Sequence, residues 1–483
     1  MGIAARSTPW LLAFACLHCG AEPGVITVND FGDAGPGNCD ATCTLRDAVA
    51  VALASVPVKP VLFSAASGWP QTITLAQGQL AISNASADAL VISGPGADKL
   101  AISAANASRV FDVVAGSFYM SALTVRDGSV IGVNANPGTN GSGGNGDSAG
   151  ITTGGCVRIA AGATAQFDRV DVRSCAAVGG KGGQGGVGAD GFSPGTGGMG
   201  GTGGQSAGGG IYTAGNLVLQ HSSVALSSST GGAGGTGGAG GSSFIQGTGG
   251  AGGFGGIGTG GAIYVSESGL LLLQNSTLTA DTATGGVGGT GGVGGVTGGH
   301  GGNGGDAYGL SLHAQGATGM AAVEFSTLIA GQPTLAPGGP PGLPTGGGGI
   351  SGSIHGAAIW GGGPVTVLSS IVVGGGPAFA LCANNVAAEP GSANVDQDSS
   401  CGGFTLHKTF AEVLRNVEPP LPPLPAYMPV YKGSAINAAA SCTGIGGSEV
   451  FTDDQRATSR PQGNACDLGA IEADYVFVDG FTG

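Results

Sequence analysis

The sequence predicts an all-β fold, a parallel β-helix (β-solenoid) with glycine-rich inserted loops. The main indication is a repeated unit made of a Gly-Gly lead, a short apolar run, a turn and a second β-branched run. Long glycine tracts separate the units, and 104 of the 483 residues are glycine, far from ordinary globular composition. Only 9% of residues are charged and 41% are hydrophobic, which favours a folded chain over a disordered one. The units are predicted to begin at Val157, Ile211, Ile263, Leu310 and Ile359.

One helical period precedes the repeats. Leu45 to Leu53 (LRDAVAVAL) has the spacing of an amphipathic helix, with Thr42 or Thr44 as its N-cap. Such a helix would cover the open backbone of the first turn, as the end of a solenoid requires. Closely spaced apolar runs then predict two to three uninterrupted turns, through the segments 73–75, 80–82, 90–92, 100–102, 110–113 and 123–125.

The β-branched runs inside the units explain why the strands should stack. A run such as Leu270 to Leu278 (LLLLQNSTL) is too apolar for a one-sided antiparallel strand and too short for a buried helix. Stacking on the equivalent run of the next turn, about 4.8 Å away, would satisfy its backbone donors and bury its inward residues. Asn275-Ser276, His221-Ser222 and Ser326 would then share one corner, either hydrogen-bonding between turns or facing solvent; the sequence leaves both alternatives open.

The glycine tracts account for the irregular length of the unit. They consist largely of Gly-Gly-x triplets, and removing some 20–30 residues from each unit leaves about 20–27, the length of one solenoid turn. Glycine has no side chain to bury and loses the most backbone entropy, so we expect the tracts to hang outside the core from one corner. The predicted insertions are 179–209, 231–261, 285–305 and 338–349.

The charge balance excludes several classes of protein. Fifteen Lys and Arg against 29 Asp and Glu give a net charge of −14, and the cations never form the stripe that nucleic-acid binding requires. The glycines lack the every-third spacing of collagen, and no run of 18 apolar residues after the N-terminus could span a bilayer. The remaining partners are polysaccharides or cell-surface components, and the sequence does not predict the oligomeric state.

Export is predicted from both the N-terminus and the cysteines. Residues 1–21 combine Arg6, a short apolar run and a small-x-small end at Ala21, typical of a signal peptide; a disordered N-terminus and a lipoprotein acylated at Cys16 are the alternatives. The cysteines that follow form an even, locally spaced set without Cys-x-x-Cys doublets, which favours disulfides over zinc. They are Cys39 and Cys43, Cys156 and Cys175, Cys382 and Cys401, and Cys442 and Cys466, although eight cysteines allow 105 pairings.

The two ends of the chain resemble domains of exported bacterial proteins. Cys43-Thr44-Leu45-Arg46-Asp47-Ala48 and the strand before it resemble the CSLREA-type cap, and Gly-Gly-Ala-Ile at 260–263 is similar to the GGAI motif of polymorphic outer-membrane proteins. The C-terminal segments resemble the choice-of-anchor Q domain, with Asn437 in place of its usual Asp and Ala457 in place of its usual Gly. They are 433–438, Cys442, 452–456, 460–463 and 466–472.

This resemblance implies a right-handed parallel β-helix displayed on a bacterial cell surface, at the outer membrane or outside the cell. It divides the chain into a signal peptide, a CSLREA-like cap, the β-helix, and a choice-of-anchor Q-like closing segment with a terminal tag. The corresponding ranges are 1–21, 22–60, 61–430 and 431–483.

No catalytic, cofactor-binding or metal-binding residue is predicted. In the cluster Asp168 to Arg173, strand alternation would place Arg169, Asp171 and Arg173 on one face as a salt-bridged outer surface. Asp453 to Arg456 is expected to pin a loop through hydrogen bonds. Asp396, Asp398 and Ser400 offer a weak Ca²⁺ loop, because three oxygens fall short of the six to eight that Ca²⁺ takes. The six histidines show no i, i+4 or triad arrangement.

The sequence therefore predicts an exported structural or adhesive protein without catalytic activity. The alternative is a carbohydrate-active β-helix enzyme, either a polysaccharide lyase or a glycoside hydrolase. A groove that holds two facing carboxylates and aromatic platforms would favour that alternative.

Overall fold

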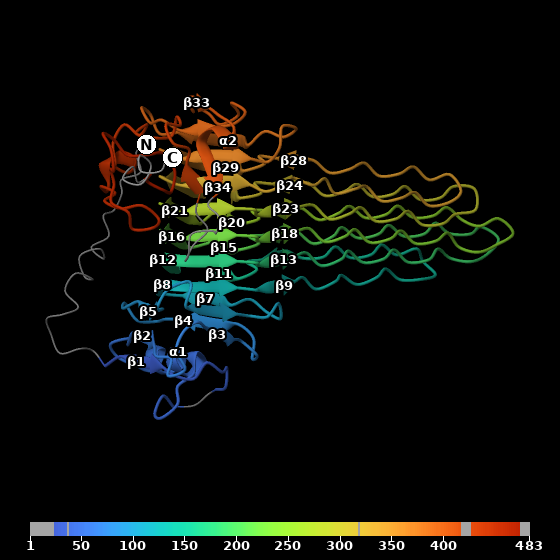
Figure 1. The fold of residues 1–483 in the computed structure, drawn as a ribbon. Helices are drawn as coiled ribbons and strands as arrows, with labels where there is room; N and C mark the ends of the chain where they lie inside the picture. Colours follow the sequence, from blue (N-terminus) through green and yellow to red (C-terminus); the bar gives the residue numbers. More distant parts are fainter. Residues whose placement is uncertain (1–23, 36–37, 317–318, 417–426, 474–483) are drawn as a thin grey trace.

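The computed structural model describes residues 24–35, 38–316, 319–416 and 427–473 and confirms the predicted all-β parallel β-helix. Successive turns stack along one axis, and a long arm projects sideways from one corner (Figure 1). Each turn contributes strands to three faces, which the chain visits in the order first, second, third before it enters the arm. The pairings between the turns are parallel, and most keep one register throughout, as β11 does with β15; β4–β7 and β29–β31 each contain a register shift.

The first face contains β4 (Leu80–Ser83), β7 (Phe111–Ala115), β11 (Val157–Ile159), β15 (Ile211–Thr213), β20 (Ile263–Val265), β25 (Leu312–Ala314), the start of β29 (Ile359–Leu368) and the start of β31 (Cys382–Ala388). The second face contains β1 (Ile26–Val28), β2 (Val61–Phe63), β5 (Leu90–Ser93), the first halves of β8 (Ser117–Arg126) and β12 (Thr164–Arg173), β16 (Asn216–Gln220), β21 (Leu270–Gln274), β26 (Met320–Glu324) and the ends of β29 and β31.

The third face contains β3 (Gln71–Thr74), β6 (Leu100–Ser103), the second halves of β8 and β12, β17 (Ser223–Ala225), β22 (Thr277–Thr279), β27 (Thr327–Ala330), β30 (Ile371–Gly374), β32 (Val395–Asp396) and β33 (Leu406–His407). Two narrow sheets form the root of the arm: β9 (Ser129–Ile131), β13 (Ala176–Val178), β18 (Ser228–Thr230) and β23 (Thr282–Thr284) lead out, and β10 (Thr152–Thr153), β14 (Ser206–Ala207), β19 (Gly258–Thr259), β24 (Ala307–Tyr308) and β28 (Ile354–His355) lead back.

The predicted helix is present as α1 (Leu45–Ala54). Thr44 is its N-cap, with its side chain accepting a hydrogen bond from the Asp47 N–H. The apolar side of α1 packs on the first turn, as expected of a cap. The other short elements lie near the C-terminus and are α2 (Phe410–Val413), β34 (Leu414–Asn416), β35 (Tyr427–Pro429) and the 3-10 turn η1 (Ile445–Gly447). Among the residues described, no helix is long and apolar enough to cross a membrane.

A glycine with positive φ sets the start of each unit. Gly208 (φ 70°) lies three residues before Ile211, and a Cβ there would lie 2.3 Å from the Ile211 carbonyl oxygen. Gly309 (φ 54°) occupies the same position relative to Leu312, which pairs with Ile263. The predicted start at Leu310 is therefore wrong by two residues, because the positive-φ glycine and not the Gly-Gly pair marks the turn.

Each predicted second run is in fact two strands joined at a corner. The corner residue has positive φ in successive turns, among them His221 (48°) and Asn275 (44°). In four successive turns the next residue is a buried serine (Ser222, Ser276, Ser326 and Ser370), and the Ser222 N–H donates to Ser276 Oγ (3.0 Å) while the Ser276 N–H donates to Ser326 Oγ (3.2 Å). Of the two alternatives for this corner, hydrogen bonding between turns is confirmed.

All eight described cysteines form the four local disulfides: Cys39–Cys43, Cys156–Cys175, Cys382–Cys401 and Cys442–Cys466.

The glycine tracts form the arm, and they lie outside the solenoid core as expected. The arm, here called the glycine arm, consists of the out-and-back segments 132–151, 179–205, 231–257, 285–306 and 331–353. Each segment has an outgoing leg and a returning leg, and the outgoing legs of neighbouring segments form one layer, joined by hydrogen bonds such as Gly182 N–H to Ala233 O (2.9 Å). The returning legs form a second layer, and other glycine N–H groups join the two layers, as in Gly235 N–H to Gly201 O (2.8 Å). The arm is thus an ordered two-layer array whose three-residue period matches that of a polyproline II-type helix.

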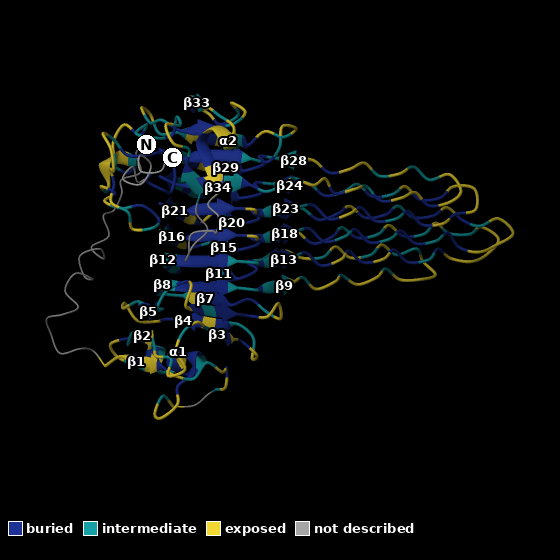
Figure 2. Cartoon of the chain, in the orientation of Figure 1, coloured by how far each residue is buried: buried dark blue, intermediate teal, exposed yellow. Residues whose placement is uncertain are grey.

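Close approach of neighbouring backbones explains the Gly-Gly-x composition. A Cβ on Gly235 would lie 1.9 Å from the Gly183 carbonyl oxygen, and similar clashes occur along every leg. The third residue of each triplet points outward, as Thr236 does, and has room for a side chain. Many arm glycines are therefore buried although they belong to no apolar core (Figure 2).

Prolines occupy the outer edge of the arm. Gly288, Gly291 and Gly294 donate to the carbonyls of the last outgoing leg. The equivalent donor positions on that leg are Gly338, Pro341 and Pro344, two of which carry no N–H. A sixth leg or another chain therefore finds few donors there, which protects the edge from further pairing.

We predict that Gly235→Ala loosens the arm, because the new methyl group collides with fixed backbone and overpacking typically costs about 1–3 kcal/mol. Hydrogen exchange followed by mass spectrometry should show arm amides in 179–257 exchanging at least tenfold faster. Thr236→Ala is the matched control and should exchange like the wild type. Equal protection in G235A and the wild type would contradict the packing described.

Candidate functional site

A column of aromatic rings runs along the first face. Tyr212, Tyr264, His313 and Trp360 occupy equivalent positions on β15, β20, β25 and β29. Their ring centroids are 5.4, 4.8 and 4.4 Å apart in that order, the first two pairs being stacked. Each ring follows the buried residue that starts its unit, so parallel stacking brings together residues about 50 positions apart.

Two further rings from the returning root strands extend this column. Tyr308 on β24 stacks on His355 of β28 (4.6 Å) and meets Trp360 edge to face (5.3 Å). We call the six rings the aromatic column. The column was not predicted, although the sequence carries a signal for it: the residue after the buried start of each of these four units is Tyr, Tyr, His or Trp once the third of them is placed at Leu312.

The aromatic column combines a buried middle with partly exposed ends. Tyr264 is 9% exposed and His313 2%, whereas Tyr212, Tyr308, His355 and Trp360 are half-buried. Burial raises the pKa of Tyr264 and lowers the pKa of His313 to about 4, so both rings are uncharged at neutral pH. The neutral His313 ring lies 2.9 Å from Gln315 Oε1 through its Nε2.

Polar groups border the aromatic column. Tyr308 Oη donates to Asp306 (3.3 Å), and burial followed by the Asp306 charge raises the pKa of Tyr308. Burial is the main cause of the raised pKa of Tyr264, followed by the neighbouring Tyr212 and then by the charge of Glu267.

On the preceding turns the same position holds Asp112 and Arg158, joined by a bidentate ion pair at 2.8 Å. The surface therefore offers apolar rings and hydrogen-bonding groups side by side.

A second cluster joins the C-terminal segment to the solenoid. His221 Nδ1 lies 2.9 Å from Asp168 and its Nε2 lies 3.4 Å from Asp453, while Arg169 contacts both carboxylates at 2.6 and 3.5 Å. We call these four residues the latch. Burial alone would lower the pKa of His221, but its bonds to the two carboxylates raise it to about 9, and the bond from His221 lowers the pKa of Asp453. Two acids therefore face two cations at neutral pH.

The latch corrects part of the sequence interpretation. Arg169 is a corner residue (φ 55°), so strand alternation breaks there, and Arg169 pairs with Asp168 while Arg173 pairs with Asp171. The expected common face of Arg169, Asp171 and Arg173 is wrong, although the salt bridges exist. Nothing in the sequence signalled that Asp453, some 285 positions away, would complete the cluster.

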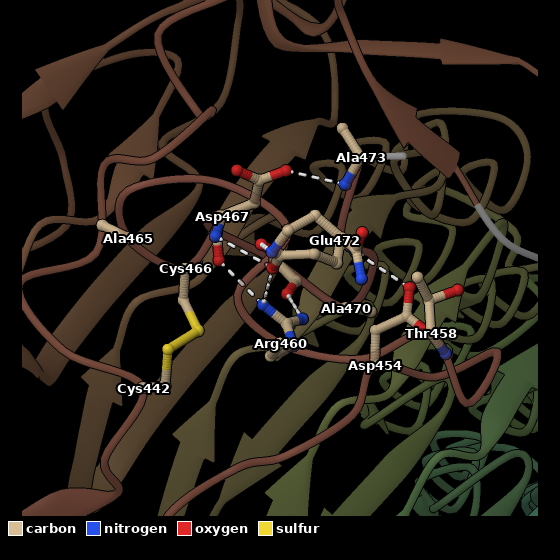
Figure 3. A network of polar contacts seen from close by, with 12 residues as sticks. Cys442, Asp454, Thr458, Arg460, Ala465, Cys466, Asp467, Ala470, Glu472 and Ala473 are labelled. Carbon is tan, nitrogen blue, oxygen red and sulfur yellow. Dashed lines mark hydrogen bonds and ion pairs between the residues drawn. A yellow bond between two sulfur atoms is a disulfide. The ribbon is translucent and has the colours of Figure 1, made fainter. Parts of the chain in front are cut away.

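The C-terminal segment folds around a buried ion pair (Figure 3). Arg460 and Glu472 lie 3.0 Å apart with both side chains inaccessible, and Arg460 also donates to the Asp467 and Gly469 carbonyls. Asp454 accepts from the Arg456, Thr458 and Glu472 N–H groups, which confirms its predicted loop-pinning role.

This segment docks on the third face. Gln455 accepts from Thr277 Oγ1 (2.6 Å) and donates to the Ser222 carbonyl (3.0 Å), while Ala470 N–H donates to Thr327 Oγ1 (3.0 Å).

The weak calcium loop is occupied by protein contacts. Asp396 accepts from the Cys401 N–H and contacts His407, and Asp398 accepts from the Leu381 N–H and from Ser400. Within the described parts of the chain, no three His, Cys, Asp or Glu side chains are grouped to hold a metal ion. The predicted signal peptide and terminal tag fall in 1–23 and 474–483, outside the described residues.

Comparison with known proteins leaves the family open. No family model and no curated protein sequence matches the chain, so the CSLREA and choice-of-anchor Q resemblances are not confirmed. Among solved structures, pectate lyase Pel9A matches with 13% identity, 93% of this chain, 97% of that chain and a TM-score of 0.27.

The expectation of a protein without catalytic activity finds no support in this comparison, since the matched structure is that of an enzyme. A likeness this distant transfers no activity, substrate or residue role to the present chain.

We predict that the latch weakens at high pH. The pKa of His221 is raised from 6.5 to about 9, so its stabilisation is fully present below pH 6.5 and is lost as the pH rises through 9. His221→Asn removes the charge and keeps a side chain that tolerates this corner, as Asn275 does. Thermal unfolding should show H221N less stable than the wild type by roughly 1–3 kcal/mol at pH 7, with the difference shrinking towards pH 10. A difference independent of pH would contradict the charged latch.

Proposed function

We propose that this protein is an extracellular polysaccharide-binding β-helix protein and that the aromatic column is its sugar-binding surface. The observation that carries the proposal is the column of six rings from two sheets, four of which (Tyr212, Tyr308, His355 and Trp360) are half-buried and reach the surface, with Asp306 and Glu267 at its border. Sugars present C–H groups that pack on aromatic rings and hydroxyls that bond to carboxylates and phenols. An elongated row of such groups suits a chain of sugars better than a compact metabolite.

Dimensions and charge narrow the ligand class. Tyr212 and Trp360 are three turns apart, which at about 4.8 Å a turn gives a row of roughly 14 Å. Arg158 at the Tyr212 end of this row is paired with Asp112, which the buried Arg109 also contacts at 3.9 Å. With a net charge of −14, the protein would repel an acidic polymer, so we propose an uncharged polysaccharide.

Four disulfides support the extracellular location, because such bonds persist in oxidising compartments. An adhesive role at a bacterial cell surface is part of the same proposal, since retention on a polysaccharide is what an adhesin requires.

Polysaccharide cleavage is the second candidate function. Glycoside hydrolysis uses a pair of carboxylates beside the bound sugar, and Asp306 and Glu267 adjoin the aromatic column. The latch is less suited to this chemistry, because Arg169 and His221 neutralise its two carboxylates.

We predict that the double variant Tyr212→Ala, Trp360→Ala loses at least tenfold in affinity for a neutral polysaccharide that retains the wild type, because both half-buried ends of the column disappear. The measurement is retention on insoluble neutral glucans, mannans and xylans, with unchanged circular dichroism as the folding check. Tyr431→Ala, an exposed tyrosine outside the column, is the control. Equal retention of the double variant, or no retention of the wild type by any of these polymers, would refute the proposal.

The same samples test cleavage. Release of soluble sugar by the wild type, lost in Glu267→Gln and Asp306→Asn with retention preserved, would support the second candidate. Retention without release would exclude it and leave the binding function in place.

A further inference from the structure

The free end of the glycine arm carries exposed apolar side chains. Phe192 and Phe244 are each 100% exposed, and Ile245, Val296 and Leu343 are 66–70% exposed. Each lies in the turn between an outgoing and a returning leg, so adjacent hairpins bring them to one end, where Figure 2 shows exposed residues. We call these five residues the arm tip.

The two phenylalanines are held in neighbouring turns. The Ser242 N–H donates to Asp190 Oδ1 (2.5 Å) and the Gly191 N–H donates to the Ser242 carbonyl (3.3 Å), which ties one turn to the next. Phe192 and Phe244 then line a cleft of about 450 Å³, whose other walls are Gly191, Ser242 and Ser243. The cleft is shallow, open to solvent and lined mainly by carbon.

The position of the arm tip makes its apolar character informative. The two-layer backbone array behind it projects the tip away from the solenoid (Figure 1), so neither the core nor the C-terminal segment covers it. Large side chains that are fully exposed at a projecting end contribute nothing to folding, and they indicate contact with another apolar phase.

Charge and contact area distinguish between a protein partner and a lipid bilayer as the binding partner of the arm tip. Within the four turns that carry the arm tip, 190–195, 242–246, 294–298 and 343–345, Asp190 is the one charged residue and its carboxylate is already bonded. The two phenylalanines offer roughly 300–500 Å², so a protein partner would have to cover all five apolar residues, spread over four turns, to approach the roughly 800 Å² per partner of a stable interface. A bilayer surface needs no matching partner area, and the lack of cations at the tip argues against anionic headgroups.

We propose that the arm tip inserts into the surface of a lipid bilayer with zwitterionic headgroups, with Phe192 and Phe244 among the acyl chains and the cleft between them holding one chain. The solenoid and its aromatic column then stand away from the membrane at the other end of the arm. This contact is independent of the proposed sugar binding and uses none of its residues.

The test is flotation of the full chain with phosphatidylcholine vesicles. Wild type should float with the vesicles, and the double variant Phe192→Ser, Phe244→Ser should bind at least tenfold more weakly. Phe254→Ser is the matched control: it removes an exposed phenylalanine (55%) from the flank of the arm and should float like the wild type. Hydrogen exchange of the arm amides in all three proteins shows whether the array is intact.

Three outcomes would overturn the proposal: absence of wild-type flotation, equal loss in F254S and the double variant, or binding that requires phosphatidylglycerol in the vesicles. The first would leave the apolar tip without a lipid partner, the second would assign binding to the flank of the arm, and the third would assign it to electrostatics. Polysaccharide retention by the double variant should equal that of the wild type, which keeps this result separate from the proposed function.

Discussion

Parallel stacking of one turn on the next, with backbone hydrogen bonds in register, is the constraint from which the rest of this structure follows. Each turn must place its N–H groups opposite the carbonyls of its neighbour at about 4.8 Å, whatever lies between the turns in sequence. Residues at equivalent positions therefore form continuous columns. Inward columns become the apolar core, the corner column becomes the buried serine ladder, and one outward column becomes the row of aromatic rings.

The glycine arm extends the same constraint beyond the solenoid. Its legs leave successive turns already aligned by β9, β13, β18 and β23, so the entropic cost of bringing them together is largely met at the root. The backbones must then approach closely both within each layer and between the two layers, and a side chain at Gly235 or Gly183 would prevent that approach. Proline at positions 341 and 344 then ends the array at its outer edge.

The outward column of aromatic rings and the tip of the glycine arm place the two proposed functions at different ends of the molecule. At the arm root, aromatic rings from the solenoid and from the returning strands meet with carboxylates at their border. At the far end, apolar residues stand on turns that carry almost no charge. On the solenoid itself, the C-terminal segment is held on the third face by the latch and by Gln455, so a segment remote in sequence contacts the middle turns.

The sequence alone was sufficient for the features that depend on residue patterns within short segments. The alternating runs and the Gly-Gly-x tracts predicted a parallel solenoid with its glycines outside the core. The local cysteine couples predicted four disulfides, and Leu45 to Leu53 with Thr44 predicted the capping helix. These features need only the preferences of short segments, and the structure confirms them.

Tertiary structure decided everything that depends on register between turns. The start at Leu312 instead of Leu310, the corner at Arg169, the aromatic column and the meeting of Asp168, His221 and Asp453 all join residues separated by about 50 to 285 positions. The irregular length of the insertions hides that register from the sequence. A two-residue error in one unit is enough to remove His313 from its column, because the interaction energy resides in contacts between turns and not within them.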